Sequence, residues 1–236
     1  MLFKKLSAPS LKELFVSELE GMILSGKLEI GAKLPPEREL AESMQVSRAV
    51  INSGIAEMEK KGFLVVKPRI GTFVADYRRY GTVETLVSIM NYNGGMLRDS
   101  EVRSILEVRI QFMSLAATLA IENASDAEIE SLRPYADALA ECTDPEEAAA
   151  LIFQFSHELS FISGNSLLPL FFISFKTLVC RLWVRYADKY GIAPLAKSAA
   201  DIYRYVALRD ARGAVACITE NTQESIDGTR TIYSRK

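Results

Sequence analysis

Histidine and cysteine are scarce in this 236-residue sequence, which contains one histidine and three cysteines. A lone histidine leaves little for a general base and excludes a metal site built from several imidazoles. The cysteines, Cys142, Cys180 and Cys217, lie far apart without the paired spacing of a zinc knuckle, so we interpret them as buried, reduced thiols. The sequence also has no GxSxG elbow and no phosphate-cradling glycine loop. We therefore expect neither an enzyme nor a bound cofactor.

A long hydrophobic run is also missing. The most apolar stretch, residues 167–184, is interrupted by Lys176 and Arg181, and its aromatic residues favour a buried core helix over a membrane span. The N-terminal residues lack the apolar run and the cleavage site of a secretion signal. These absences predict a cytoplasmic protein without a membrane partner.

A strong charge of one sign is absent as well, because 28 Lys and Arg residues face 30 Asp and Glu residues, for a formal net charge of −2. Residues 1–80 contain 13 basic and 10 acidic residues (+3), and the remainder contains 15 and 20 (−5), which together give −2. The excess of positive charge in residues 1–80 is modest for a nucleic-acid binder. It is compatible with a small DNA reader that needs a second copy, because phosphate neutralisation grows with the number of contacts.

Residues 35–74 are the most informative stretch, because their segments predict successive helices of a DNA-reading module. Pro35 and Pro36 before an acidic first turn form a helix start signal. A short break precedes Ser47, whose hydroxyl can cap a second helix. That helix ends at Gly62, a residue type common just past a helix C-terminus.

The second helix has an apolar stripe and a polar outer face. Residues at helical spacing predict the buried stripe, namely Val50, Ile51, Ile55 and Met58. The remaining positions lie on the outer face, namely Arg48, Ala49, Asn52, Ser53 and Ala56. Residues 63–66 and 72–74 are rich in β-forming residues and enclose a basic tip, which predicts a strand, a turn and a returning strand. The whole pattern predicts a winged helix-turn-helix, completed by an amphipathic helix upstream that ends near Gly26.

These residues resemble the DNA-binding domain of the GntR family of bacterial transcription regulators. The segments PPERELAE, VSR, MEKKGF and GTFV match that family in order and spacing. The resemblance implies that Arg38 and Arg48 contact DNA, whereas Asn52 replaces a third family arginine. Arg69 replaces a glycine that usually lies two residues before the GT of the wing.

Side-chain chemistry divides the expected DNA contacts into two groups. In the major groove, Arg48 can bind guanine through two hydrogen bonds and Asn52 can bind adenine in the same way. The remaining expected contacts are to the phosphate backbone or belong to the wing, namely Arg38, Ser47, Lys67, Arg69, Gly71 and Thr72.

The second half of the chain is predicted to be entirely helical. We expect a winged domain at residues 1–76, a linker at 77–82, and a bundle of six or seven helices at 83–236. Expected helices of the bundle include 126–142, 166–190 and 210–231. The segments LEVRIQFMSLAATLAIENAS and HELSFISGN resemble the effector domain of the FadR subgroup, which implies a cavity that binds a small metabolite.

Many FadR-type relatives bind a divalent metal in this cavity through one aspartate and three histidines. Here His157 matches one ligand, Phe153 stands where the aspartate is expected, and the last histidine position falls near Asn221. We therefore expect no metal.

The expected effector has an acidic head and an apolar body. The resemblance places Arg109 in the cavity, where it can bind a carboxylate or phosphate. The other candidate ligand-binding residues are Phe112, Met113, Phe153, His157, Arg181, Trp183 and Tyr186. The segment FKTLVCRLWVRY is similar to the family member that senses fatty acyl-coenzyme A, so an acyl thioester stands beside a small organic acid as a candidate effector. The competing interpretation is that Arg109 pairs with Glu107 and that the aromatic residues and methionines are plain core.

Together these features predict a DNA-binding transcription regulator that acts as a homodimer on a pseudo-palindromic operator and responds to a small-molecule effector. Two alternatives remain open. One is an architectural DNA-binding dimer without a ligand, and the other is a metabolite-binding or enzymatic helical domain attached to a degenerate DNA module.

Overall fold

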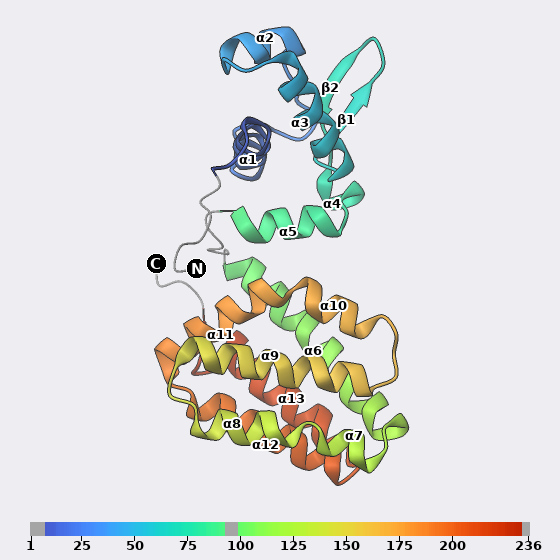
Figure 1. Ribbon diagram of the computed structural model, residues 1–236, viewed down its shortest axis with the longest axis vertical. Helices are drawn as coiled ribbons and strands as arrows, with labels where there is room; N and C mark the ends of the chain where they lie inside the picture. Colours follow the sequence, from blue (N-terminus) through green and yellow to red (C-terminus); the bar gives the residue numbers. More distant parts are fainter. Residues whose placement is uncertain (1–7, 93–98, 233–236) are drawn as a thin grey trace, which may run out of the picture. The chain divides into compact units, whose positions relative to one another are not determined.

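The computed structural model describes residues 8–92 and 99–232, and the chain divides into two compact units, residues 1–96 and 97–236. The elements of the first unit are α1 (Leu11–Leu24), α2 (Glu37–Ser43), α3 (Arg48–Lys60), β1 (Leu64–Lys67), β2 (Gly71–Val74), α4 (Tyr77–Tyr80) and α5 (Val83–Asn91) (Figure 1). The strands pair antiparallel, with Leu64 opposite Val74 and Lys67 opposite Gly71. This arrangement confirms the predicted winged helix-turn-helix.

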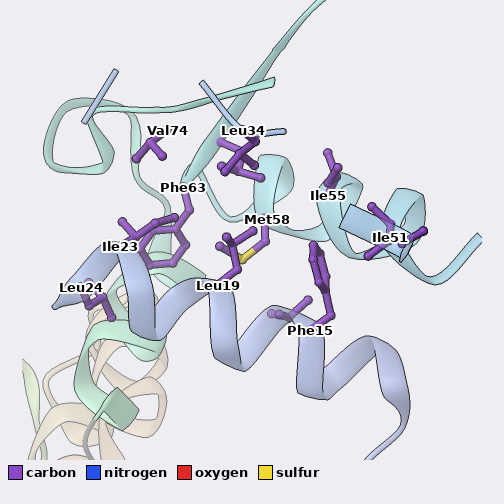
Figure 2. Packing of buried hydrophobic residues seen from close by; sticks show 13 residues of the cluster. Phe15, Leu19, Ile23, Leu24, Leu34, Ile51, Ile55, Met58, Phe63 and Val74 are labelled. Atoms are coloured by element: carbon purple, nitrogen blue, oxygen red, sulfur yellow. The ribbon is translucent and has the colours of Figure 1, made fainter. Parts of the chain in front are cut away.

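The core of the first unit lies between α1, α3 and the base of the wing. Figure 2 shows Phe15 and Leu19 of α1 facing Met58 of α3, with Phe63 completing the cluster. Gly54 has no room for a side chain, because an added Cβ would overlap the Phe15 ring. The close approach of α1 and α3 therefore depends on this glycine.

The α5 helix packs in the first unit, whereas the sequence placed it at the start of the helical domain. The Ser88 hydroxyl donates to Glu20 Oε1 of α1 at 2.8 Å, and the Thr85 hydroxyl donates to the carbonyl of Lys61 at the end of α3. Ile89 packs against the same apolar core. The linker expected at 77–82 contains α4 instead, whose Tyr77 ring lies 5.4 Å from the ring of Phe63.

The described residues of the second unit form a helical bundle without strands. Its elements are α6 (Asp99–Asn123), α7 (Asp126–Glu130), α8 (Arg133–Glu141), α9 (Pro145–Ile162), α10 (Leu168–Ser174), α11 (Lys176–Tyr190), α12 (Ala193–Ala207) and α13 (Ala211–Ile226) (Figure 1). The α6 helix packs against α9 and α13, α9 packs against α11, and α12 packs against α8 and α13. The expected all-helical bundle is confirmed, but its described residues form eight helices rather than six or seven, because two of the expected helices are divided.

Three helix boundaries differ from the sequence expectation. The helix expected over 126–142 divides into α7 and α8, because Pro134 has no amide to continue the helical hydrogen bonds. The helix expected over 166–190 divides at Phe175, where the backbone leaves helical geometry (φ −100°, ψ 3°). The last helix ends at Ile226 rather than near residue 231.

The α6 helix is the one described helix whose length and composition would allow it to cross a membrane, with a mean hydropathy of 1.4 over its most apolar window. No such helix was expected from the sequence. In the structure α6 packs within the bundle, and 28% of that window is buried. Core helices of bundles meet the same criteria, so length and composition do not distinguish the two settings.

Candidate nucleic-acid interface and ligand cavity

The α3 helix separates its apolar residues from its polar residues as the sequence predicted. The Ser47 hydroxyl caps the helix by accepting a hydrogen bond from the amide of Val50 at 3.3 Å. Ile51 and Met58 are fully buried, whereas Arg48 and Asn52 are exposed. An exposed arginine and asparagine one turn apart can reach neighbouring base pairs when the helix enters a major groove.

The α2 helix presents a second exposed arginine. The Arg38 side chain is 79% exposed, and its Nε lies 2.9 Å from Glu42 Oε1 one helical turn away. Because exposed ion pairs contribute little free energy, this guanidinium can exchange Glu42 for a phosphate oxygen at small cost.

The wing carries a cluster of cations around the Phe73 ring. Lys67 Nζ lies 5.0 Å from the ring centroid, and Lys33 Nζ lies 5.9 Å from it. The backbone of Lys33 pairs with Phe73 in an isolated antiparallel bridge, which extends the wing by one short segment. Lys33 was not among the residues expected from the sequence, because its pairing with the wing depends on tertiary structure.

The wing tip has unusual backbone geometry. Arg69 has a φ of 64°, and Gly71 has a φ of 135°. The positive φ of Gly71 favours a glycine, and a Cβ added there would also displace the end of the Lys33 side chain, whose Cε would lie 2.6 Å away. Thr72 lies beside it in β2, and its carbonyl accepts a hydrogen bond from the amide of Leu34 at 2.9 Å.

In the second unit, a cavity of about 50 Å³ lies between α6, α9, α11, α12 and α13. Its apolar wall includes Ile105, Leu106, Ile152, Val179, Leu182 and Leu195. Its polar and aromatic wall is formed by Arg109, Trp183, Tyr186, Ser198, Asn221, Ser225 and Arg230. None of the described residues that line this cavity is acidic.

Arg109 is a buried charged residue that lines the cavity. Its Nη1 donates to Thr222 Oγ1 at 2.8 Å, and its guanidinium lies 5.3 Å from the centroid of the Trp183 ring. Burial lowers the pKa of Arg109 to about 10, so the group remains protonated at neutral pH. Glu107, the alternative partner considered from the sequence, pairs with Arg103 at 3.0 Å instead. Among the described residues no carboxylate pairs with the Arg109 guanidinium, so the arrangement suits an anionic ligand.

The structure brings only three of the predicted ligand-binding residues to this cavity, namely Arg109, Trp183 and Tyr186. Met113 and Phe153 are buried in the close-packed core, and Phe112 packs against Phe171 with 5.4 Å between ring centroids. His157 stacks on Phe153 at 5.7 Å rather than facing the cavity.

Arg181 also lies away from the cavity, on the exposed side of α11. Helical phase explains this difference. Residues two positions apart point to nearly opposite sides of a helix, so Arg181 and Trp183 cannot face the same space. In the same way, Ile152 faces the cavity and the adjacent Phe153 does not.

Ser198, Ser225 and Arg230 also line the cavity but were not predicted from the sequence. Asn221 was identified there only as the position of an absent metal ligand. The amide nitrogen of Asn221 donates to Ser198 Oγ at 3.0 Å. In the part of the chain that the structure describes, no three His, Cys, Asp or Glu side chains gather in a way that could hold a metal ion. Phe153, His157 and Asn221 do not supply a ligand set, and the absence of a metal remains a prediction.

Comparisons with known proteins match both units. The model of bacterial regulatory proteins of the gntR family matches residues 12–74, and the FCD domain model matches residues 104–224. The HTH-type transcriptional regulator Mce2R of Mycobacterium tuberculosis is 30% identical over 145 residues, which cover 61% of this chain and 60% of that protein. The fatty acid metabolism regulator protein of Shewanella pealeana is 29% identical over 161 residues, which cover 68% of this chain and 65% of that protein.

Another curated relative, the HTH-type transcriptional regulator LutR of Bacillus subtilis, is 29% identical over 151 residues, which cover 62% of this chain and 65% of its own length. The chain thus spans about 60% to 65% of the length of the curated relatives it matches. Among solved structures, Lar of Listeria monocytogenes has the same fold, with a TM-score of 0.59 at 17% identity, over 92% of this chain and 95% of that one. The chain belongs to the GntR family of bacterial regulatory proteins, in the FadR subgroup that joins a winged helix-turn-helix to an FCD domain.

Proposed function

We propose that this protein is a transcription regulator that binds a pseudo-palindromic operator as a homodimer and senses a small acidic metabolite in its helical domain. The observation that carries the proposal is the joint exposure of Arg48 and Asn52, which lie one turn apart at the start of α3, while the apolar stripe of the same helix is buried. A helix of this kind can enter the major groove while the wing approaches the flanking backbone. The names of the curated relatives, which are transcriptional regulators, support the same function.

The proposal assigns different roles to the DNA-facing residues. Arg48 and Asn52 read bases, whereas Arg38, Lys67 and Arg69 bind phosphates, together with the hydroxyls of Ser47 and Thr72. Gly71 shapes the wing tip. One module makes few contacts, so two copies on two half-sites supply the affinity that regulation needs.

The helical domain binds the acidic group of the effector at Arg109. The polar and ring contacts of this buried guanidinium in the described part of the chain are to a hydroxyl and an aromatic ring, so it gains free energy from an anion. The cavity of about 50 Å³ favours a small organic acid, because a long acyl thioester would require the helices to move apart. The effector changes operator affinity only if it binds two states of the protein with different affinity.

The small size of the cavity also favours a second candidate function, an architectural DNA-binding dimer without an effector. A catalytic role is a weaker candidate, since the described residues of the cavity offer Ser, Asn and Tyr side chains but neither a carboxylate nor a histidine. We therefore propose that the protein is not an enzyme. The proposed binding to an operator also favours a protein of the cytoplasm.

Selection of DNA from a random pool by the full-length protein tests the proposal, followed by binding titrations on the selected operator. Arg48→Ala should weaken operator binding by about 1–3 kcal/mol and relax the preference at one base pair in each half-site. Arg79→Ala, a change of an exposed arginine in α4, serves as the matched control and should leave both unchanged. An Arg48→Ala protein with unaltered affinity and base preference would rule out the proposed reading face.

Thermal-shift screening with short organic acids, followed by operator titration, separates the sensor from the architectural dimer. The sensor requires an acid that raises the melting temperature and also changes operator affinity. Binding of an acid without any change in operator affinity would rule out the sensor, whereas the absence of a melting shift with every acid would support the architectural dimer.

A further inference from the structure

The chain beyond α13 turns back over the ligand cavity. We call residues 228–232 the C-terminal strap. Its Ile232 is only 2% exposed and lines the cavity. Lys189 Nζ and the Tyr190 hydroxyl, at the end of α11, both donate to the carbonyl of Thr231 at 2.7 Å. These contacts make the strap part of the cavity wall.

The strap begins with a close return against α13. A Cβ added to Gly228 would lie 2.6 Å from Glu224 Cα, so no larger residue fits without a backbone shift. The Glu224 carboxylate accepts hydrogen bonds from the amide and the hydroxyl of Thr229 at 3.1 and 3.0 Å. The Glu224 carbonyl also accepts a bond from the Arg230 amide at 3.2 Å. Local bonds to one turn of α13 therefore set the position of Arg230.

Arg230 lies at the boundary between two spaces. It lines the inner cavity and also an outer cleft of about 680 Å³, which shares Pro194, Ser198 and Asn221 with that cavity. The hydrogen bond to the Tyr186 hydroxyl, which itself lines the inner cavity, raises the pKa of Arg230. The exposed Arg230 guanidinium thus lies where the inner cavity meets the outer cleft, which we call the mouth of the cavity. Arg109 lies inside the cavity.

Size and charge together restrict the ligand. An inner cavity of about 50 Å³ has room for roughly three or four water molecules, which corresponds to one acidic group and a short stem. The rest of a ligand bound to Arg109 must extend toward the outer cleft and past Arg230. The residues that line only the outer cleft include three carboxylates, Glu220, Glu224 and Asp227, and one cation, Lys197. Their net charge is negative, so a second acidic group is favoured at Arg230 rather than further out.

We infer that the C-terminal strap is the outer wall of the effector site and that its Arg230 binds the second carboxylate of a short dicarboxylate whose first carboxylate binds Arg109. This inference rests on the proposed effector site in the helical domain. Arg230 is then a specificity residue that distinguishes dicarboxylates from monocarboxylates. The two arginines each form charge-assisted hydrogen bonds to one end of the ligand.

Calorimetric titration of the full-length protein with two matched probes, butanedioate and butanoate, tests the inference. The wild-type protein should bind butanedioate more tightly than butanoate. Arg230→Gln should weaken butanedioate binding about tenfold or more and should change butanoate binding less than about twofold. Arg212→Gln, at an exposed arginine in the first turn of α13 that lines neither space, is the control and should change neither. Arg109→Gln should weaken both probes.

A purely structural role for Arg230 predicts another result, in which Arg230→Gln weakens both probes equally. That result, or a wild-type protein that binds butanedioate no better than butanoate, would overturn the inference. Hydrogen exchange supplies an independent measurement, because bound butanedioate should slow exchange of the Arg230 and Thr231 amides. Gly228→Ala should remove this protection. Unchanged exchange of these amides when butanedioate binds the wild-type protein would contradict the proposal that the strap is a wall of the effector site.

The inference and the proposed function fail in different ways. If butanoate changes operator affinity but the wild-type protein binds butanedioate no better than butanoate, the regulator stands and the role of the strap is refuted. If butanedioate binds as described but leaves operator affinity unchanged, the strap stands and the sensor function is refuted.

Discussion

At the scale of single residues, Arg69 combines a left-handed backbone with a charged side chain. Its φ of 64° lies in a region that costs a non-glycine residue roughly 1–2 kcal/mol. Arg69→Gly should therefore stabilise the protein by about 0.5–1 kcal/mol, and it should weaken operator binding because a phosphate contact is lost. Thermal unfolding and operator titration measure the two effects. Lys67→Ala is the comparison, since it should weaken binding without any gain in stability, and a fully active Arg69→Gly protein would exclude a DNA contact at the tip.

Arg109 provides a second prediction at this scale. Burial lowers its pKa in the folded protein to about 10, below the ordinary value of an arginine side chain, so folding disfavours the charged form at neutral pH. This penalty is fully present below about pH 10 and disappears as the pH rises through the two values. Arg109→Met keeps the volume and removes the charge, so the ligand-free protein should melt at the same or a higher temperature. The same change should abolish the melting shift caused by acidic ligands, and a large drop in melting temperature would contradict an uncompensated charge.

At the scale of elements, a partly buried polar cluster attaches α5 to the winged domain. Glu20 Oε1 accepts hydrogen bonds from Ser88 Oγ at 2.8 Å and from Lys61 Nζ at 2.9 Å. Ser88→Ala removes one of these bonds and should cost about 1 kcal/mol, which hydrogen exchange will detect as faster exchange of the α5 amides. Ser25→Ala, which removes an exposed hydroxyl bond within α1, should leave α5 unchanged. Equal exchange in α5 of both variants would show that the cluster does not hold this helix.

The helices and strands of the winged domain differ in how far the sequence predicts them. The wing and α3 were predictable because their signals are local, as in the capping Ser47 and the terminal Gly62 with its φ of 73°. The glycine that usually occupies the position of Arg69 is explained by the positive φ found there. The packing partner of α5 was not predictable, because an amphipathic pattern identifies a buried face but not the surface that covers it.

The cavity was the least predictable feature, for a related reason. Aromatic residues such as Phe153 were assigned to the cavity wall because of their chemistry, but close packing places them in solid core. The strap residue Arg230 follows the last helix and has no motif around it. Only the return of the chain over the cavity shows that it faces the same space as Arg109.

At the scale of the whole molecule, the salt dependence of operator binding reports the number of protomers on the DNA. Arg38, Lys67 and Arg69 are the proposed phosphate contacts of one protomer, so a dimer makes six. The slope of log K against log salt concentration should then be about −5 for a dimer and about half that for a monomer. Arg38→Ala in both protomers should reduce the slope by about 2, whereas Asn52→Ala, which changes a base contact, should lower affinity at every salt concentration and leave the slope intact. Titrations between low and physiological salt, with sedimentation of the same complexes, separate the two assemblies. A slope near the monomer value on a full operator would mean that the two winged domains do not bind the two half-sites together, and the regulatory model would then need a different source of affinity.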